Sequence, residues 1–235
     1  MATEYRGART AHPASTYDPA AVARAIVAAG CAGVIRGAEP PITFTAGWRS
    51  PVYCDMRQLL GSPGQRAEVL VPLCRLVSDL TEEGLAAVAG GETAGIAWAG
   101  LVSGVTGLPM AYVRKAPKGH GLGRRVEGRP PRDQPVYLVD DIMTDGGSKE
   151  DFVQALLADG YQVPELVVPV YYDAFPGALE ELGIMGVRCH WLVTWQDLLA
   201  AGSASGVFSA TQVALAGEFL DDPIGWSGAH GGRSE

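Results

Sequence analysis

The residues best suited to chemistry lie in one short stretch of the sequence, VYLVDDIMTDGGSK, which spans residues 136–149. An apolar, strand-like run ends in Asp140 and Asp141, and a short loop containing Gly146 and Gly147 leads into a helix-like segment. In an open parallel sheet, ligands bind beyond the carboxyl ends of the strands, where this acid pair would lie. The paired glycines let the backbone approach an anion, and the following helix N-terminus directs N–H groups towards it.

The acid pair and the glycine loop suit different parts of one ligand. Thr144 and Ser148 add hydroxyl donors for a phosphate, whereas Asp140 and Asp141 can accept hydrogen bonds from the vicinal hydroxyls of a ribose. The loop is not a Walker motif, because the GxxxxGK[ST] pattern is absent. An isolated Asp-Asp or Gly-Gly is usually an ordinary strand end or helix cap. Strand, acid pair, glycine loop and helix in register favour a phosphosugar site instead.

A second candidate is the cationic segment, residues 114–132, within an acidic chain. The protein has 235 residues, of which 18 are basic and 26 acidic, so its formal charge is −8. The segment carries seven basic residues against one acid, Glu127, which leaves −14 on the rest of the chain. The seven are Arg114, Lys115, Lys118, Arg124, Arg125, Arg129 and Arg132. The negative total argues against nucleic-acid and membrane-surface partners, and although most charge runs are solvated loops, this concentration indicates a small polyanionic ligand.

The rest of the sequence predicts an α/β core that would position these segments. Asp18-Pro19 begins a helix that ends near Gly30, and apolar residues recur at helical spacing from Gln65 to Leu80. Short apolar runs at 86–90, 110–113, 136–140, 166–172 and 190–194 alternate with helix-like segments at 94–106, 148–159 and 177–183. Such runs suit strands buried on both faces, so we expect a mostly parallel sheet flanked by helices. A last helix is expected at 208–220.

We divide the chain into a loose N-terminal tail (1–17), an N-terminal helix with a small subdomain (18–83), the α/β core (84–220) and a C-terminal tail (221–235). The tail contains many small polar residues and is not expected to build core, although Trp226 could dock on the rest of the protein. The N-terminus lacks the apolar run of a secretory signal, and residues 96–113 are too interrupted to span a bilayer. The four cysteines show no metal or redox spacing, so we expect a reduced, cytoplasmic protein without a membrane segment.

Four segments resemble one enzyme family, and the resemblance as a whole covers about residues 18–200. VYLVDDIMTDGGS resembles the phosphoribosyl pyrophosphate (PRPP) signature of the type I phosphoribosyltransferases. YVRKAPKGHGLGRRVEG, residues 112–128, is similar to the catalytic loop of the orotate phosphoribosyltransferases, and ITFTAGWRSPVYCDMR, residues 42–57, to their orotate-pocket segment. GGETAGIAWAG, residues 90–100, resembles their pyrophosphate-side loop, and the YYDxFP string is typical of a bacterial subgroup.

The resemblance implies a type I phosphoribosyltransferase fold with an N-terminal hood subdomain, and the transfer of ribose 5-phosphate from PRPP to orotate in pyrimidine biosynthesis. It assigns catalysis to Lys118, His120 and Asp141, with Lys118 first, and the orotate pocket to Tyr53, Thr144 and Arg49. It implies PRPP binding by Thr93, Arg114, Lys115, Lys118, His120, Asp140, Asp141, Thr144, Asp145, Gly146, Gly147 and Ser148. It also implies Mg²⁺, held mainly by PRPP near the acid pair, and a homodimer with a shared active site.

Three positions depart from the family pattern. Thr45 and Ala94 stand where various members have lysine, and Ala174 follows Asp173 where the family usually has an arginine that contacts orotate; Arg49 could supply that cation. Two alternatives therefore stay open: the same chemistry on a purine or another pyrimidine, and a non-catalytic PRPP-sensing regulator. The missing arginine favours the first and the cationic loop opposes it. The second would usually need a DNA-binding domain, and the acidic N-terminal portion offers no basic recognition helix.

Overall fold

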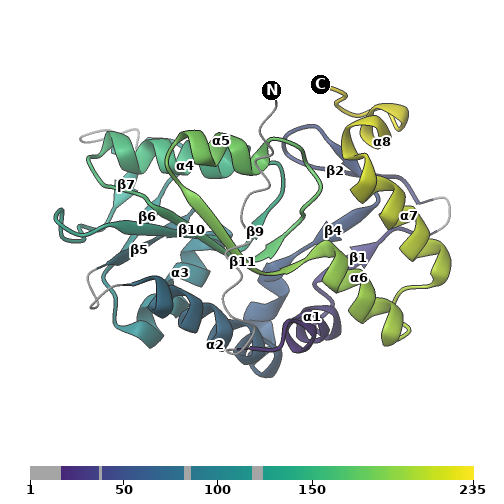
Figure 1. Cartoon of the computed structure of the whole chain (residues 1–235), viewed down its shortest axis with the longest axis horizontal. Coiled ribbons are helices and arrows are strands. Elements are labelled where there is room, and N and C mark those ends of the chain that lie inside the picture. The colour runs from purple at the N-terminus through teal and green to yellow at the C-terminus, as the bar shows by residue number, and fades with distance from the viewer. Residues whose placement is uncertain (1–16, 37–38, 82–85, 118–123) are drawn as a thin grey trace, which may run out of the picture.

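The computed structural model describes residues 17–36, 39–81, 86–117 and 124–235, and its centre is a seven-stranded sheet (Figure 1). The strand order is β11-β10-β8-β5-β6-β7, and β9 also pairs with β10. All pairs are parallel except β6 with β7. The strands are β5 (Ala87–Gly91), β6 (Met110–Val113), β7 (Val126–Glu127), β8 (Val136–Val139), β9 (Ile142–Met143), β10 (Glu165–Tyr171) and β11 (Arg188–Thr194).

The three central strands are buried along their whole length, which explains their runs of consecutive apolar residues. Every residue of β5, β8 and β10 is buried, because helices cover both faces of the sheet. Figure 1 shows α4 (Gly147–Ala158) and α5 (Ala178–Ile184) on one face, and α2 (Pro63–Leu80) and α3 (Ala94–Thr106) on the other. The expected α/β core with a mostly parallel sheet flanked by helices is confirmed.

The N-terminal part is built of one helix and short antiparallel strand pairs. The carboxylate of Asp18 caps α1 (Pro19–Ala28) by accepting a 2.9 Å hydrogen bond from the Ala20 N–H. β1 (Ala32–Val34) pairs with β4 (Val52–Cys54), β2 (Ile42–Thr43) pairs with β3 (Arg49–Ser50), and a 3-10 helix η1 (Met56–Gly61) leads into α2. The Tyr137 hydroxyl of β8 donates to the Leu80 carbonyl at 2.7 Å, so the end of α2 belongs to the core layer.

The C-terminal part contributes three helices, α6 (Trp195–Ala204), α7 (Ala210–Asp221) and α8 (Pro223–Ala229). The sequence did not predict α6, although Thr194 and Asp197 form a reciprocal capping box at its start. The expectation that the tail does not build core is wrong, whereas the docking of Trp226 is confirmed. Helix α8 buries Trp226, whose ring meets Phe219 of α7 at 5.7 Å, because one large aromatic anchors an otherwise small and polar segment.

None of the helices within the described ranges combines the length and the apolar character that crossing a bilayer requires. The predicted helices at 94–106, 148–159 and 208–220 coincide with α3, α4 and α7 to within two residues. The short strands β7 and β9 were not predicted, because two residues carry no readable periodicity.

Candidate active site

The acid pair lies at the carboxyl end of the central strand β8. Asp140 is 3% exposed, and its Oδ1 accepts a 2.9 Å hydrogen bond from the Asp141 N–H. The chain runs from β5 outwards to β6 and then returns to β8 on the other side of β5. The loops after β5 and β8 therefore leave the sheet in opposite directions, which is where open α/β sheets bind their ligands.

A buried lysine neutralises one member of the pair. Lys149 Nζ lies 2.6 Å from Asp140 Oδ2, and the two side chains are 8% and 5% exposed. Burial alone would lower the pKa of Lys149, but the carboxylates of Asp140 and Asp141 raise it above its ordinary value. Lys149 ends the VYLVDDIMTDGGSK motif, but no role was predicted for it. Its signal was a lysine in the first turn of a helix, a place that the helix dipole disfavours for cations.

The carboxyl group of Asp141 has a strongly shifted pKa. Burial, followed by the charge of Asp140, raises the pKa of Asp141 to about 7, although Lys149 opposes that shift. The carboxyl of Asp141 therefore exchanges a proton near neutral pH. Perturbed carboxyl groups of this kind are frequent at functional sites.

The phosphate loop, residues 144–148, connects β9 to α4. Gly146 has φ = +90° and precedes the first residue of the helix, and a Cβ there would lie 3.3 Å from the Ala178 carbonyl oxygen. Both facts favour glycine at this turn. Thr144 is half-buried, whereas Gly147 and Ser148 are exposed at the helix N-terminus. The loop thus presents small residues and a positive dipole end to solvent, as a phosphate site requires.

The loop after β5 brings a second helix N-terminus to the acid pair. Helix α3 begins after Thr93, at the predicted start of residue 94, and Thr93 is exposed. A Cβ on Gly95 would lie 2.5 Å from Asp140 Oδ1, so the first turn of α3 touches this carboxylate. Two helix N-termini, those of α3 and α4, therefore flank the acids, and an anion on either side meets a positive dipole end.

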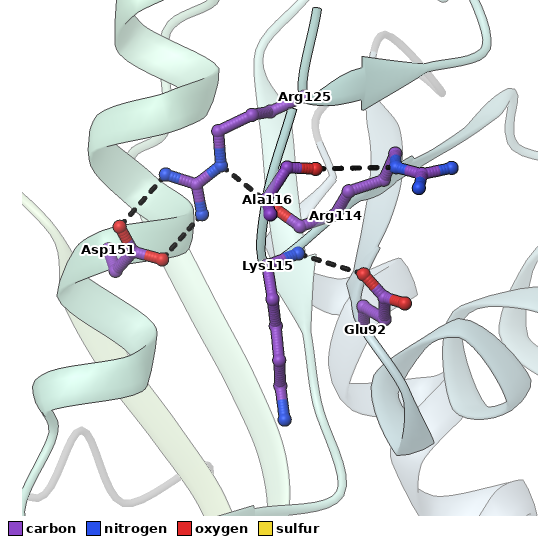
Figure 2. Close-up of polar contacts among 6 residues, drawn as sticks. All are labelled: Glu92, Arg114, Lys115, Ala116, Arg125 and Asp151. Carbon is purple, nitrogen blue, oxygen red and sulfur yellow. Dashed lines mark hydrogen bonds and ion pairs between the residues drawn. The ribbon is translucent and has the colours of Figure 1, made fainter. Parts of the chain in front are cut away.

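The base of the cationic segment is a closed hairpin stem, which Figure 2 shows in detail. The Arg114 N–H donates to the Arg125 carbonyl, and Arg125 Nε donates to the Arg114 carbonyl, both at 2.9 Å. Arg125 also makes two bonds to the Asp151 carboxylate, at 2.9 and 2.5 Å, and the Lys115 N–H donates to Glu92 Oε2 at 2.9 Å. In the close-up the Lys115 ammonium and the Arg114 guanidinium point away from the Arg125–Asp151 pair.

Two of the seven basic residues of the segment are paired with acidic residues of the core. Arg125 is tied to Asp151 of α4, and Arg132 pairs with Asp159 at 3.1 Å and lies over the Tyr161 ring. These two arginines support the core. Lys118 and His120, predicted as catalytic, lie outside the described residues, as does Gly121.

The orotate-pocket residues predicted from the sequence occupy separate places. Tyr53 of β4 is 38% exposed, and its hydroxyl accepts a 3.1 Å bond from Arg57, which is also paired with Asp55. The bond to Asp55, and to a smaller extent the charge of Asp141, raises the pKa of Arg57, so Arg57 lies within electrostatic reach of the acid pair. Arg49 contacts the Pro41 carbonyl at 3.4 Å and the C-terminal residues, while Ala174 follows β10 and is half-buried.

Comparisons with known proteins identify relatives. No protein-family model matches the chain. The orotate phosphoribosyltransferase of Cereibacter sphaeroides is 42% identical over 192 residues, which cover 81% of this chain and 83% of the relative. The orotate phosphoribosyltransferase of Agrobacterium fabrum is 39% identical over 198 residues, covering 84% of this chain and 85% of the relative.

Solved structures agree in fold. The crystal structure of the orotate phosphoribosyltransferase from Aeropyrum pernix has a TM-score of 0.63 at 32% identity, and the match covers 80% of this chain and 99% of that one. The UMP synthase of Leishmania donovani has a TM-score of 0.72 at 24% identity, covering 86% of this chain and 42% of that one. The second likeness concerns the fold alone.

Proposed function

Because the chain belongs to the orotate phosphoribosyltransferase family, we propose that the acid pair, the phosphate loop and the cationic segment each hold a different part of PRPP. The protein is a pentosyltransferase that transfers ribose 5-phosphate from PRPP to orotate, giving orotidine 5′-monophosphate and pyrophosphate. The observation that supports this division is the position of Asp140 and Asp141 between two helix N-termini.

The acid pair would hold the ribose. Asp141, with a pKa raised to about 7, accepts a hydrogen bond from a ribose hydroxyl when ionised, and Asp140 lies beside it, paired with Lys149. The bond between C1 and the pyrophosphate oxygen breaks as the bond from orotate N1 to C1 forms, and the N1 proton of orotate passes to the departing pyrophosphate or to solvent. Bond breaking runs ahead of bond formation, so positive charge develops on the ribose. Two carboxylates close to that charge stabilise it more in the transition state than in the ground state.

The phosphate loop would hold the 5′-phosphate through Thr144, Gly146, Gly147 and Ser148 at the start of α4. On the opposite side, Thr93 at the start of α3 would bind the pyrophosphate, together with Arg114 and Lys115 at the stem of the cationic segment. Lys118 and His120 belong to the same segment in sequence, and Lys118 would stabilise the departing pyrophosphate most directly.

Orotate would bind beside Tyr53 and Thr144, with a cation facing its carboxylate. Arg49 is one candidate for that role, and Arg57 is another, because Arg57 donates a 3.1 Å hydrogen bond to the Tyr53 hydroxyl. Substitution of each arginine by methionine, with orotate KM as the readout, distinguishes the two.

Mg²⁺ is proposed as part of the bound substrate. Among the described residues no three carboxylate, histidine or cysteine side chains gather as a ligand set, and Asp140 is already paired with Lys149. This donor set fits a cation that takes most of its ligands from PRPP, near Asp141. Bound in that way, Mg²⁺ supplies positive charge to the leaving pyrophosphate.

We also propose a cytoplasmic homodimer with a shared active site, as the family resemblance implies. The four cysteines are free thiols in the structure, which accords with a reducing compartment. We keep the four-part division of the chain as a proposal, with two changes: α2 packs on the sheet of the core, and residues 223–229 form the helix α8.

The test is a direct assay of PRPP, Mg²⁺ and a panel of bases, with pyrophosphate release and base consumption as readouts. We expect orotate-dependent release, and a loss of roughly two to three orders of magnitude in kcat for Lys118→Ala without a change in unfolding temperature. Release with a purine but not with orotate would contradict the assignment. Near-normal turnover in Lys118→Ala would contradict the catalytic role of Lys118.

A further inference from the structure

We propose that Trp48 is a positioning residue that fixes Asp145 in the phosphate loop, and that C-terminal residues 227–233 fix Trp48 in turn. The indole Nε1 of Trp48 donates a 2.8 Å hydrogen bond to Asp145 Oδ2. Trp48 is 5% exposed and comes from the turn between β2 and β3, so this bond joins the N-terminal subdomain to the core. The inference rests on the proposed function, because it takes residues 144–148 as the 5′-phosphate site.

Asp145 is an acid inside a loop that would bind a phosphate. A carboxylate that rotates towards the phosphate opposes it by charge repulsion, so its orientation matters to PRPP binding. The indole N–H holds Oδ2 on the side of the N-terminal subdomain, and the Thr144 hydroxyl approaches Oδ1 at 3.4 Å. Hydrogen bonds to a charged acceptor are stronger than those to a neutral one, so Trp48 can set this orientation.

The C-terminal residues hold the turn that carries Trp48. The Arg233 N–H donates to the Gly47 carbonyl at 3.0 Å, and the Arg233 guanidinium lies 4.6 Å from the centroid of the indole. The Arg49 N–H donates to Ser227 Oγ at 2.9 Å. A Cβ on Gly232 would lie 2.8 Å from the Arg49 nitrogen, so the two backbones pack closely. The residues before and after Trp48 are therefore both tied to this segment.

Aromatic side chains confine the indole from another side. The Phe175 ring lies 5.4 Å from Trp48, and Phe175 meets Phe219 of α7 at 6.1 Å. Phe219 in turn meets Trp226 at 5.7 Å, and Trp226 stacks on His230 at 3.6 Å. The chain of rings runs from the neighbourhood of the phosphate loop back to the C-terminal segment, so the indole is braced on several sides and its N–H keeps one direction.

The first test removes the N–H and keeps the aromatic ring. Trp48→Phe should raise the KM for PRPP about tenfold and leave kcat within about twofold, because the bond acts on the ground state and the transition state alike. Trp191→Phe is the matched control, since Trp191 is a half-buried indole of β11 that packs on Tyr171. The control should keep the wild-type KM. An unchanged KM in Trp48→Phe would overturn the proposal.

The second test asks whether Trp48 acts through Asp145. In an Asp145→Ala background, Trp48→Phe should change the KM for PRPP by less than about twofold, because the acid that it positions is gone. A roughly tenfold rise in the KM for PRPP in both the wild-type and the Asp145→Ala background would mean that Trp48 acts only through packing, which would overturn the proposal. A chain ended after Gly231 should also raise the KM, and that rise should likewise vanish without Asp145. An unchanged KM in the shortened chain would overturn the role of the C-terminal segment.

Failure of the proposed function would look different from failure of this inference. In the first case the wild-type protein releases no pyrophosphate when PRPP, Mg²⁺ and orotate are supplied. In the second case the wild type turns over normally and the effects of the Trp48 and Asp145 substitutions add independently.

Discussion

Replacing Lys149 by methionine tests the electrostatics of the acid pair most severely. Methionine has a similar length and apolar volume but no charge, so Asp140 loses the ammonium that lies 2.6 Å from its Oδ2. The two side chains are 8% and 5% exposed, so water cannot easily replace the lost partner. Removing one member of a buried ion pair costs about 3–5 kcal/mol. Asp140 Oδ1 keeps its bond from the Asp141 N–H, so we expect the lower end, about 3 kcal/mol.

The measurement is urea unfolding of the wild type, Lys149→Met, and Lys149→Met combined with Asp140→Asn. The double variant leaves a neutral amide instead of a carboxylate, so it should recover most of the lost stability although it loses activity. The deficit of Lys149→Met should also be smaller at pH 5 than at pH 8, because without the lysine the buried acids bind protons more readily. A deficit below about 1 kcal/mol, or a double variant no more stable than the single one, would refute the reasoning.

Three further predictions concern the same site. The folded-state pKa of Asp141 is about 7, against an ordinary value of 3.8. The protonated carboxyl group of Asp141 therefore contributes to the free energy of unfolding below pH 4, and this contribution is lost as the pH rises through 7. Asp141→Asn should therefore stabilise the fold at pH 8 by roughly 1–3 kcal/mol and at pH 4 hardly at all; equal gains in thermal unfolding at both values would contradict this. Gly95→Ala should lower kcat/KM for PRPP at least tenfold, because its Cβ would lie 2.5 Å from Asp140 Oδ1, whereas Gly100→Ala in the same helix, 3.9 Å from its nearest neighbour, should not. If two subunits share one active site, mixing inactive Lys118→Ala and Asp141→Asn proteins should restore part of the activity, and confirmed heterodimers without activity would count against a shared site.

The core of the fold could be predicted from the sequence because its signals are local. Runs that are apolar at consecutive positions indicated β8 and β10, and the Asp-Asp and Gly-Gly pairs following β8 indicated a ligand loop. The partners of those residues could not be predicted, because Lys149 reaches Asp140, and Trp48 reaches Asp145, only after the chain has folded. Sequence spacing carries no record of such contacts.

The C-terminal segment is a second case in which tertiary contacts could not be predicted from the sequence. Its small polar residues indicate a loose tail in which Trp226 could dock, but composition does not show where the tryptophan docks or that a helix forms around it. Arg49 was predicted for the orotate pocket from its motif, whereas its backbone is tied to Ser227 of α8. A motif shows which segment belongs to the site, whereas the role of each side chain in that segment depends on its tertiary contacts.

The register of the central strands has a consequence for folding kinetics. Val136 of β8 pairs with Ala87 of β5, and Leu138 pairs with Leu166 of β10, so β8 joins strands that are distant from it on either side in sequence. Parallel pairings of this kind form slowly, because long loops must close before the contacts can form. Asp140 and Lys149 are close in sequence, but the burial that strengthens their ion pair is expected to be complete only after β5 and β10 have paired with β8. Loss of their ion pair should accelerate unfolding far more than it slows refolding, a difference that stopped-flow measurements on Lys149→Met would detect.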